Sequence, residues 1–600
     1  MEPQDQVTEI IAAYTAVLQE RGPLPGDEVK AAVVTRLGLD MANPATEQLV
    51  ESSYDVLLTG EAATLALVSP DVVAHLGTLL AGSVLTHRLS EAEHAEGYLL
   101  LDADLGAFVC FDVPTLDGEL LSIDDLDDGP MSWGGPEGWL DGFRPGALLA
   151  VSVTADSTVT IAEAEPTEAQ GLAAYLREVY ESFIEESQVP VPLDYVLAGM
   201  VHRKPDVFAA PALPLGELVT AAGLQWRDGL VAHTEEMWQL AEQFDMLNRL
   251  ADGTGSDEAA ETAFEAIAVL TDPAAEPADL RATLTLLTDP MVRLAVTEEM
   301  LGDADDPERL AQFTAVTARL VELAGDRRAA VANWMAAVAA EREGRVLDAE
   351  PLLRAAERAD SADQLVTDRL AWYASDRGDA AEALRRWTVL LDEPDRDPDV
   401  EAVRPHANPA AASQPGRNEP CWCGSGRKFK RCHSGKPMLA PLSQRARWLY
   451  RKAAAYLQRR GGAATAAVGW STDALAVDTL MREEGWFTPF LADRGPLLPA
   501  DEAELAATWT DIDRTVFEVL DPQTLRDERT GTTITVAEAA PADVGDLVCS
   551  RALPDGGGAH ILIAPFVIDP EDRDDLLGLL ARHNTPELLE WVEGVVHSSP

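Results

Sequence analysis

The chain has few cysteines, no long apolar run and no signal-like start. It holds five cysteines in 600 residues, and three of them lie within twelve positions, at 421, 423 and 432. This usage argues against a disulfide framework and fits a metal site in a reducing compartment. The longest apolar runs, such as 561–568, are far shorter than the ~20 residues that span a bilayer. The first residues lack the basic and apolar regions of a secretory signal. We therefore expect a cytoplasmic protein.

Positive charge is also scarce. Lysine and arginine number 46 against 103 acidic residues, so the net charge is −57. The field of such a chain repels phosphates, which argues against binding of nucleic acid or anionic membranes by the whole surface. The simplest interpretation is a solvated acidic exterior. With 46% hydrophobic residues, a chain of this length is globular and too long for one core.

Residues 1–94 have mainly helical periodicity. Apolar residues recur at helical spacing from Ile10 to Leu18, and two more short helices follow after Gly/Pro turns. Three such helices are compatible with a winged-helix-like fold. A DNA-reading helix should be basic, yet the second helix offers Lys30 and Arg36 alone, so a plain helical packing domain is the favoured alternative. His87 and His94 have no cysteine or third histidine beside them. We therefore expect satisfied or exposed histidines rather than ligands.

Residues 95–165 are predicted to form a small β domain. Strand character at 98–113 and 147–161 flanks an acidic, glycine-rich loop at 124–142 that contains Trp133 and Trp139. Such a loop either plugs the end of a small barrel or forms the lip of a ligand site, and the plug is favoured. Cys110 is expected in the core of a strand. Residues 166–323 are helical and acidic, and their carboxylates indicate solvated helix faces.

Residues 324–391 carry an internal repeat of 34 residues. It relates Gly344 to Gly378 and Ala349 to Ala383, and a large apolar residue follows each alanine by one turn. The pattern resembles the tetratricopeptide repeat, which implies stacked helix pairs and a curved surface for peptides or helices. A helical bundle with chance spacing is the alternative. Residues 392–415 are proline-rich and lack periodicity, so they are predicted to form a linker.

The C-terminal part is predicted to be helical over 441–495 and a small β or α+β domain over 510–600. Four short strands are expected there, at 516–519, 532–536, 545–551 and 560–567, before a last helix from about Asp572. Cys549 and His560 fall in strands, and no nucleophile elbow accompanies them. No catalytic motif is recognised in the chain, so we expect a protein that is not an enzyme.

The strongest motif is the pattern C-x-C-x8-C-H within residues 416–437. Zinc prefers four ligands in a tetrahedron, and thiolate together with imidazole suits it. The predicted ligands are Cys421, Cys423, Cys432 and His433. About 20 residues cannot bury enough core to fold alone, so Zn²⁺ would supply the folding energy, about 10–16 kcal/mol for structural sites. Four protein ligands leave no position for a catalytic water, which favours a structural zinc.

These residues resemble the SEC-C family, the metal-binding motif found at the C-terminus of the translocation ATPase SecA and in many otherwise unrelated bacterial proteins. The residues that match the family pattern are Gly416, Arg417, Asn418, Pro420, Cys421, Cys423, Gly424, Ser425, Gly426, Lys428, Phe429, Lys430, Cys432 and His433. Trp422 and Glu419 depart from the family pattern, but neither position is one of the predicted ligands. The resemblance implies zinc held by the four predicted ligands. In SecA the motif serves contacts with a chaperone and the ribosome. The chain has no GxxxxGK[ST] loop, so it is not expected to be a SecA-like ATPase.

The segment from Gly416 to Arg460 holds twelve lysines and arginines and one acidic residue, Glu419. Two interpretations stay open. This basic segment either docks on the protein's own acidic body or contacts ribosomal RNA, another nucleic acid or an acidic partner. The candidate binding residues in the zinc module are Arg417, Arg427, Lys428, Lys430, Arg431 and Lys436. The helix expected over 445–460 is amphipathic, so one of its faces should be packed.

Together these features predict a multidomain α+β protein, mostly helical, with tetratricopeptide-like repeats, two small β-containing domains and a short zinc module. The leading hypothesis is a zinc-binding interaction or adaptor protein. The alternative is a ribosome- or nucleic-acid-associated regulator that uses the basic zinc module and the N-terminal helices.

Overall fold

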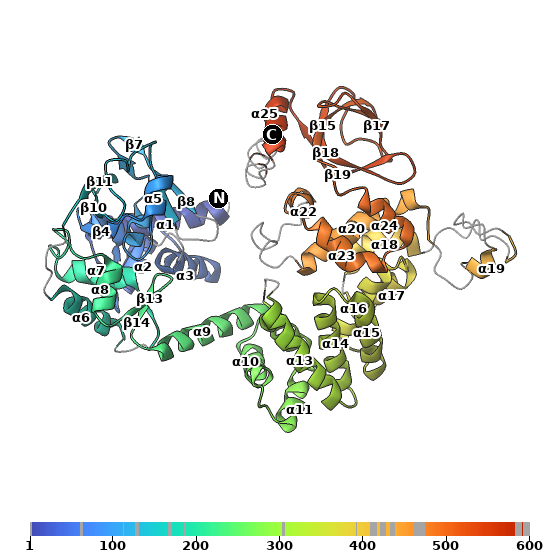
Figure 1. Ribbon diagram of the computed structural model, residues 1–600, viewed down its shortest axis with the longest axis horizontal. Helices are drawn as coiled ribbons and strands as arrows, with labels where there is room; N and C mark the ends of the chain where they lie inside the picture. Colours follow the sequence, from blue (N-terminus) through green and yellow to red (C-terminus); the bar gives the residue numbers. More distant parts are fainter. Residues whose placement is uncertain are drawn as a thin grey trace. The chain divides into compact units, whose positions relative to one another are not determined.

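The computed structural model describes residues 3–59, 64–111, 113–125, 131–165, 171–184, 188–302, 306–391, 393–407, 417–419, 428–432, 439–460, 474–582, 588 and 591. The chain divides into two compact units, Met1–Asp245 and Met246–Pro600 (Figure 1). Helices alternate with several small sheets, which makes this a multidomain, mainly helical α+β protein. None of the described helices combines the length and apolarity needed to cross a membrane.

The first unit begins with three helices and a small sheet. Its elements are α1 (Pro3–Arg21), β1 (Leu24–Pro25), α2 (Gly26–Leu37), α3 (Pro44–Thr59), β2 (Leu65–Ser69) and β3 (Val72–His75). The strands pair antiparallel in the order β1-β3-β2. The spaced apolar residues of the three helices form a core around the fully buried Tyr14, Val29 and Val50. Helix–strand–helix–helix–strand–strand is the element order of a winged helix.

Two sheets follow. The larger has the order β4-β10-β11-β6-β7 and the smaller the order β5-β9-β8. Their strands are β4 (Val84–Arg88), β5 (Tyr98–Leu100), β6 (Thr115–Leu116), β7 (Glu119–Leu120), β8 (Ser122–Asp125), β9 (Met131–Gly134), β10 (Leu148–Val153) and β11 (Thr158–Glu163). All pairs are antiparallel except β6 with β11. The short helices α4 (Leu76–Leu80) and α5 (Glu91–Glu96) flank β4.

The strand predicted over 98–113 is wrong beyond Leu100. The backbone N–H of Asp104 donates to Asp102 Oδ1 at 3.1 Å, and the N–H of Gly106 donates to Asp102 O at 2.6 Å. This turn leads into the 3₁₀ helix η1 (Gly106–Cys110), because an aspartate that caps its own turn competes with strand pairing. Cys110 is buried as expected, but in this helix and not in a strand.

The two tryptophans of the 124–142 segment lie in different surroundings. Trp133 is fully buried on β9 and stacks on Phe108 with the ring centroids 6.2 Å apart. Trp139 is half-buried, and its Nε1–H donates to Gly97 O at 2.7 Å. Both rings therefore pack against the protein itself, which favours a plug of the domain over the lip of a ligand site.

A second set of three helices and three strands completes this unit. It comprises α6 (Leu172–Ile184), β12 (Val191–Pro192), α7 (Leu193–Arg203), α8 (Leu215–Ala221), β13 (Gln225–Arg227) and β14 (Leu230–Ala232). The sheet order β12-β14-β13 repeats that of β1-β3-β2, so the element order of the N-terminal set occurs twice. The sequence predicted helices alone here, because strands of two or three residues are too short to show alternation. Helix α9 (Glu235–Thr254) follows.

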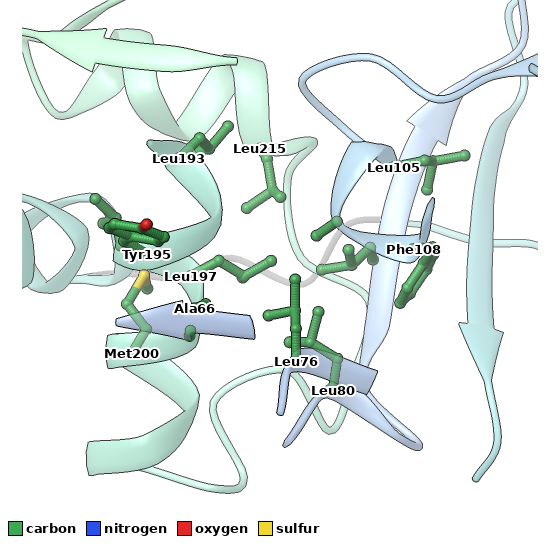
Figure 2. Close-up of a cluster of buried hydrophobic side chains, with 14 of the residues drawn as sticks. Ala66, Leu76, Leu80, Leu105, Phe108, Leu193, Tyr195, Leu197, Met200 and Leu215 are labelled. Carbon is green, nitrogen blue, oxygen red and sulfur yellow. The ribbon is translucent and has the colours of Figure 1, made fainter. Parts of the chain in front are cut away.

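One hydrophobic core joins these parts of the first unit (Figure 2). Ala66 of β2 and Leu76 of α4 come from the N-terminal part, Phe108 from the β-rich part, and Leu197 of α7 and Leu215 of α8 from the second helix–strand set. The predicted limits at 94/95 and 165/166 fall inside this core. The three segments therefore fold as one body.

The second unit starts with helix pairs. Its helices are α10 (Asp257–Thr271), α11 (Pro277–Leu286), α12 (Pro290–Leu301), α13 (Pro307–Leu323), α14 (Arg328–Arg342), α15 (Val346–Ala359), α16 (Gln364–Asp376) and α17 (Ala380–Leu390). The 34-residue period is visible in the structure. Gly344 and Gly378 both have positive φ after the first helix of a pair, and Ala349 and Ala383 are both fully buried. These are paired helices, and their identity as tetratricopeptide repeats stays a prediction.

Residues 398–407, inside the predicted linker, form helix α18 (Pro398–Ala407). Asp397 Oδ1 accepts from the backbone N–H groups of Asp399 and Val400, which starts the helix. Val400 and Val403 are fully buried. Two apolar residues one turn apart are enough to dock a helix, but too few to reveal it in a proline-rich sequence.

The remaining helices and a five-stranded sheet complete the unit. The helices are α19 (Phe429–Cys432), α20 (Leu442–Arg460), α22 (Ala474–Arg482), α23 (Phe487–Arg494), η3 (Gly495–Leu497), α24 (Ala500–Ala507) and α25 (Arg573–Arg582). The strands are β15 (Thr515–Asp521), β16 (Thr524–Asp527), β17 (Thr533–Thr535), β18 (Leu547–Pro554) and β19 (His560–Ile568). They are ordered β17-β16-β15-β18-β19. Strand β16 was not predicted, and the other four lie where strands were expected.

Candidate metal centre and basic surface

Two backbone hydrogen bonds join the described residues on either side of residues 420–427 of the motif. The backbone N–H of Phe429 donates to Glu419 O at 2.9 Å, and that of Lys430 donates to Arg417 O at 3.0 Å. These two bonds hold residues 417–419 against the start of α19. Phe429 is buried, as expected for a side chain that covers the site.

The predicted ligands fit zinc by their chemistry. Cys421, Cys423 and His433, and the side chain of Cys432, lie outside the described residues. Their residue types, three thiolates and one imidazole, suit a tetrahedral zinc site.

The described basic residues of the zinc module face solvent. Arg417, Lys428, Lys430 and Arg431 are exposed, and none forms an ion pair with a residue that the structure describes. Arg427 and Lys436, also predicted for the binding surface, lie outside the described residues. We call the four exposed residues the module cations. They offer positive charge that no described residue neutralises by an ion pair.

Helix α20 carries the other half of the basic segment, and two of its six cations, Arg445 and Lys452, are buried. Arg445 forms ion pairs with Asp501 and Glu502, and its Nε–H donates to Ala440 O at 2.7 Å. Lys452 Nζ lies 2.6 Å from Glu502 Oε2. The side chains of Arg445, Lys452 and Glu502 are at most 1% exposed. Two cations thus share one buried carboxylate, an arrangement that requires every partner to be in place.

Aromatic rings and further carboxylates complete the contacts of α20. Arg451 Nε lies 2.6 Å from Asp399 Oδ1 of α18. The guanidinium of Arg459 lies 3.5 Å from the ring centroid of Trp372. Arg447 pairs at an exposed position, with Glu538 at 2.8 Å. This half of the basic segment therefore docks on the protein's own acidic body.

Trp448 anchors the same helix. Its Nε1–H donates to Ser375 Oγ of α16 at 3.1 Å, Lys452 Nζ lies 4.2 Å from its ring centroid, and His406 stacks on it at 5.1 Å. Burial, with the charges of Arg445 and Lys452, lowers the pKa of His406 to about 4. His406 is thus held neutral inside the seam between α16, α18 and α20.

The N-terminal helices lack a basic face. Lys30 pairs with Glu51, and Arg36 Nη1 lies 3.0 Å from Glu20 Oε2. Helix α3 holds the place of a recognition helix in this element order, and it exposes Glu47, Glu51 and Asp55 along one side. The two basic residues noted in the sequence are therefore neutralised, and the exposed charge of α3 is negative.

Comparison with known proteins places the resemblance in the zinc module. Residues 417–435 match the SEC-C motif family, and these residues are a SEC-C motif. The chain is also 62% identical over 37 residues to the protein translocase subunit SecA of Myxococcus xanthus (strain DK1622). That match covers 6% of this chain and 4% of the SecA chain, so the whole protein's role is not given by it. No solved structure matches the chain.

Proposed function

We propose that this protein is a cytoplasmic, zinc-binding interaction protein that acts by binding and not by catalysis. The SEC-C motif, a type associated with zinc, supports the first part. In this proposal Cys421, Cys423, Cys432 and His433 hold one Zn²⁺, and the metal orders the loop between residues 419 and 428. Because all four positions are protein ligands, the zinc is structural.

The single observation that carries the interaction role is the contrast in charge neutralisation. Arg445 and Lys452 are both paired with the buried carboxylate of Glu502, whereas the module cations face solvent without an ion pair to any described residue. The zinc module therefore presents a cationic surface to an anionic partner. The helix pairs α14–α17 serve in the proposal as the adaptor's peptide-binding scaffold, a role that their tetratricopeptide-like period supports.

Metal analysis of the purified full chain tests the zinc site. The double variant Cys421→Ser with Cys423→Ser should contain one zinc per chain fewer than the wild type. The variant Cys549→Ser is the matched control, because that thiol is buried in β18 and far from the motif in sequence. Equal zinc in the double variant and the wild type would sink the proposal.

A second candidate function is favoured by the same exposed cations: association with the ribosome or another nucleic acid. It predicts co-sedimentation with ribosomes that weakens steeply with salt, since each phosphate contact releases a counterion. Charge reversal of Lys428, Lys430 and Arg431 to glutamate should abolish it, and Arg447→Glu on α20 should leave it unchanged. Retained binding in the triple variant would exclude the module as the contact. The acidic side of α3 makes the N-terminal helices the weaker site for phosphate.

A further inference from the structure

A cluster of metal-ligating side chains lies in the first unit, in a part of the chain remote from the SEC-C motif. His87 of β4 is flanked by Glu93 of α5 and by two aspartates of the loop between β5 and η1, Asp102 and Asp104. One ligand atom each from His87, Asp102 and Asp104 lies within 4.8 Å of the others. His87 Nδ1 is 3.3 Å from Asp104 Oδ2, and His87 Nε2 is 2.7 Å from Glu93 Oε1. Both ring nitrogens thus face carboxylates.

Backbone groups orient the carboxylates. Glu93 accepts from the N–H of Leu100 at 2.9 Å and from the N–H of Ser90 at 2.8 Å, in the capping box that opens α5. Asp104 Oδ1 accepts from the N–H of Gly216 at 2.9 Å, and Asp102 Oδ1 from the N–H of Asp104 at 3.1 Å. Each aspartate has one oxygen held by the backbone, and the second oxygen of Asp104 faces His87 Nδ1.

The described lysines and arginines do not balance the charge of the cluster. Side-chain exposure is 6% for His87, 1% for Glu93 and 16% for Asp104. Among the described residues, no lysine or arginine forms an ion pair with Glu93, Asp102 or Asp104. Even with a doubly protonated imidazole, three carboxylates exceed one positive charge. Enclosed carboxylates without a counter-charge are costly, and a divalent cation is the partner that would remove the excess.

We propose that His87, Asp102 and Asp104 bind a divalent cation of the Mn²⁺ or Zn²⁺ class, with Glu93 as a positioning residue. One imidazole and two carboxylates suit these ions. With the metal bound, the Nε2–H of His87 would donate to Glu93 and the Nδ1 lone pair would face the metal, the usual support of a ligating histidine. The sequence favoured a satisfied histidine because no cysteine or third histidine is near, and it did not associate carboxylates 15 and 17 residues further along the chain.

The position of the site assigns its role. Its ligands come from β4 and the β5–η1 loop, and Asp104 is bonded to Gly216 at the start of α8 in the second helix–strand set. A cation here ties the β-rich part of the first unit to that set. Removing the cation should therefore loosen the junction between them without unfolding the unit's shared hydrophobic core.

The test is a titration of the metal-free full chain with Mn²⁺. The electron paramagnetic resonance signal of the free ion gives the concentration of unbound Mn²⁺ at each step. The wild type should bind one Mn²⁺ per chain. The electron spin echo of the bound ion should show modulation by the nitrogen of one imidazole. Asp102→Asn, which keeps the oxygen that accepts from Asp104, should lower the affinity at least tenfold. Glu93→Gln should lower it about 10- to 100-fold. Glu96→Gln, exposed at the end of α5, is the matched control and should bind as the wild type does.

Two further measurements keep the outcome clear. The double variant Cys421→Ser with Cys423→Ser should bind Mn²⁺ like the wild type, because a thiolate-rich site selects zinc, so the result does not depend on the SEC-C motif. Thermal unfolding without metal should show that Asp102→Asn folds. No Mn²⁺ binding by the wild type, equal binding by Asp102→Asn, or bound Mn²⁺ without nitrogen modulation would each overturn the site. In that case His87 forms a simple ion-paired cluster.

Discussion

The two halves of the basic segment 416–460 are alike in composition but differ in where their cations lie. The module cations at 417–431 face solvent, whereas Arg445 and Lys452 of α20 are buried against Glu502. The difference lies in the residues between the cations. Helix α20 has an apolar face that packs into the core, and the cations next to this face are buried with it. The apolar face consists of Trp448, Leu449, Ala453, Tyr456 and Leu457. Among the described residues of the module, only Phe429 is buried.

This contrast shows why net charge is a poor guide to a binding surface. A cation on an amphipathic helix is drawn against acidic neighbours when the apolar face packs, and its charge then serves stability. A cation on a short metal-ordered loop has no such face and stays available. A basic stretch is therefore a candidate surface only where apolar periodicity is missing.

The largest effect is expected from Glu502→Gln. The change leaves the buried Arg445 and Lys452 without their shared carboxylate, so the free energy of unfolding of the second unit should fall by about 3–5 kcal/mol. Urea unfolding followed by tryptophan fluorescence measures it, since Trp448 lies in the seam. Glu538→Gln, which removes the exposed partner of Arg447, should cost less than about 1 kcal/mol. Equal costs in the two variants would erase the distinction between the halves.

A smaller effect is expected from pH. The pKa of His406 is lowered to about 4 in the folded protein, against about 6.5 in an unfolded chain. Between these values the unfolded chain binds a proton that the folded chain does not, so stability declines as pH falls from 7 towards 4. The loss from this residue should be about 1–3 kcal/mol. Unfolding measured across this range should show less pH dependence in His406→Phe, which keeps the ring stack on Trp448, and identical slopes would contradict the assignment.

Loss of zinc should affect the module alone. In Cys421→Ser with Cys423→Ser, residues 417–436 should become sensitive to trypsin, because a segment this short depends on its metal for folding. The free energy of the main unfolding transition should change by less than about 0.5 kcal/mol, since surface changes remote from a core cost little. Limited proteolysis and urea unfolding give the two readouts. A large loss of global stability would mean that the module is packed like α20.

The smallest effect on stability is expected from charge reversal of Lys428, Lys430 and Arg431. These residues are exposed and form no ion pair with the described part of the chain, so the thermal midpoint should stay within about 1 °C of the wild type. A clear rise or fall would show that the module docks on the protein itself. The same variant would then lose its value as a probe of partner binding.

Some features followed from the sequence because their causes are local. The three N-terminal helices follow from apolar spacing and Gly/Pro stops, and four of the five strands over 515–568 from runs of β-branched residues. The strand predicted beyond Leu100 failed because Asp102 caps a turn there. The strands β12–β14 and the helix α18 were missed because so few residues carry their pattern.

By itself, the sequence determined the SEC-C motif and the four residues predicted to bind zinc, because ligand type and spacing within thirteen residues are sufficient for that chemistry. Tertiary structure alone decided which cations remain available and where carboxylates converge. Arg445 meets Glu502 across 57 positions, and Asp104 meets Gly216 across 112. Packing of distant apolar faces creates such pairs, so no local pattern of residues announces them.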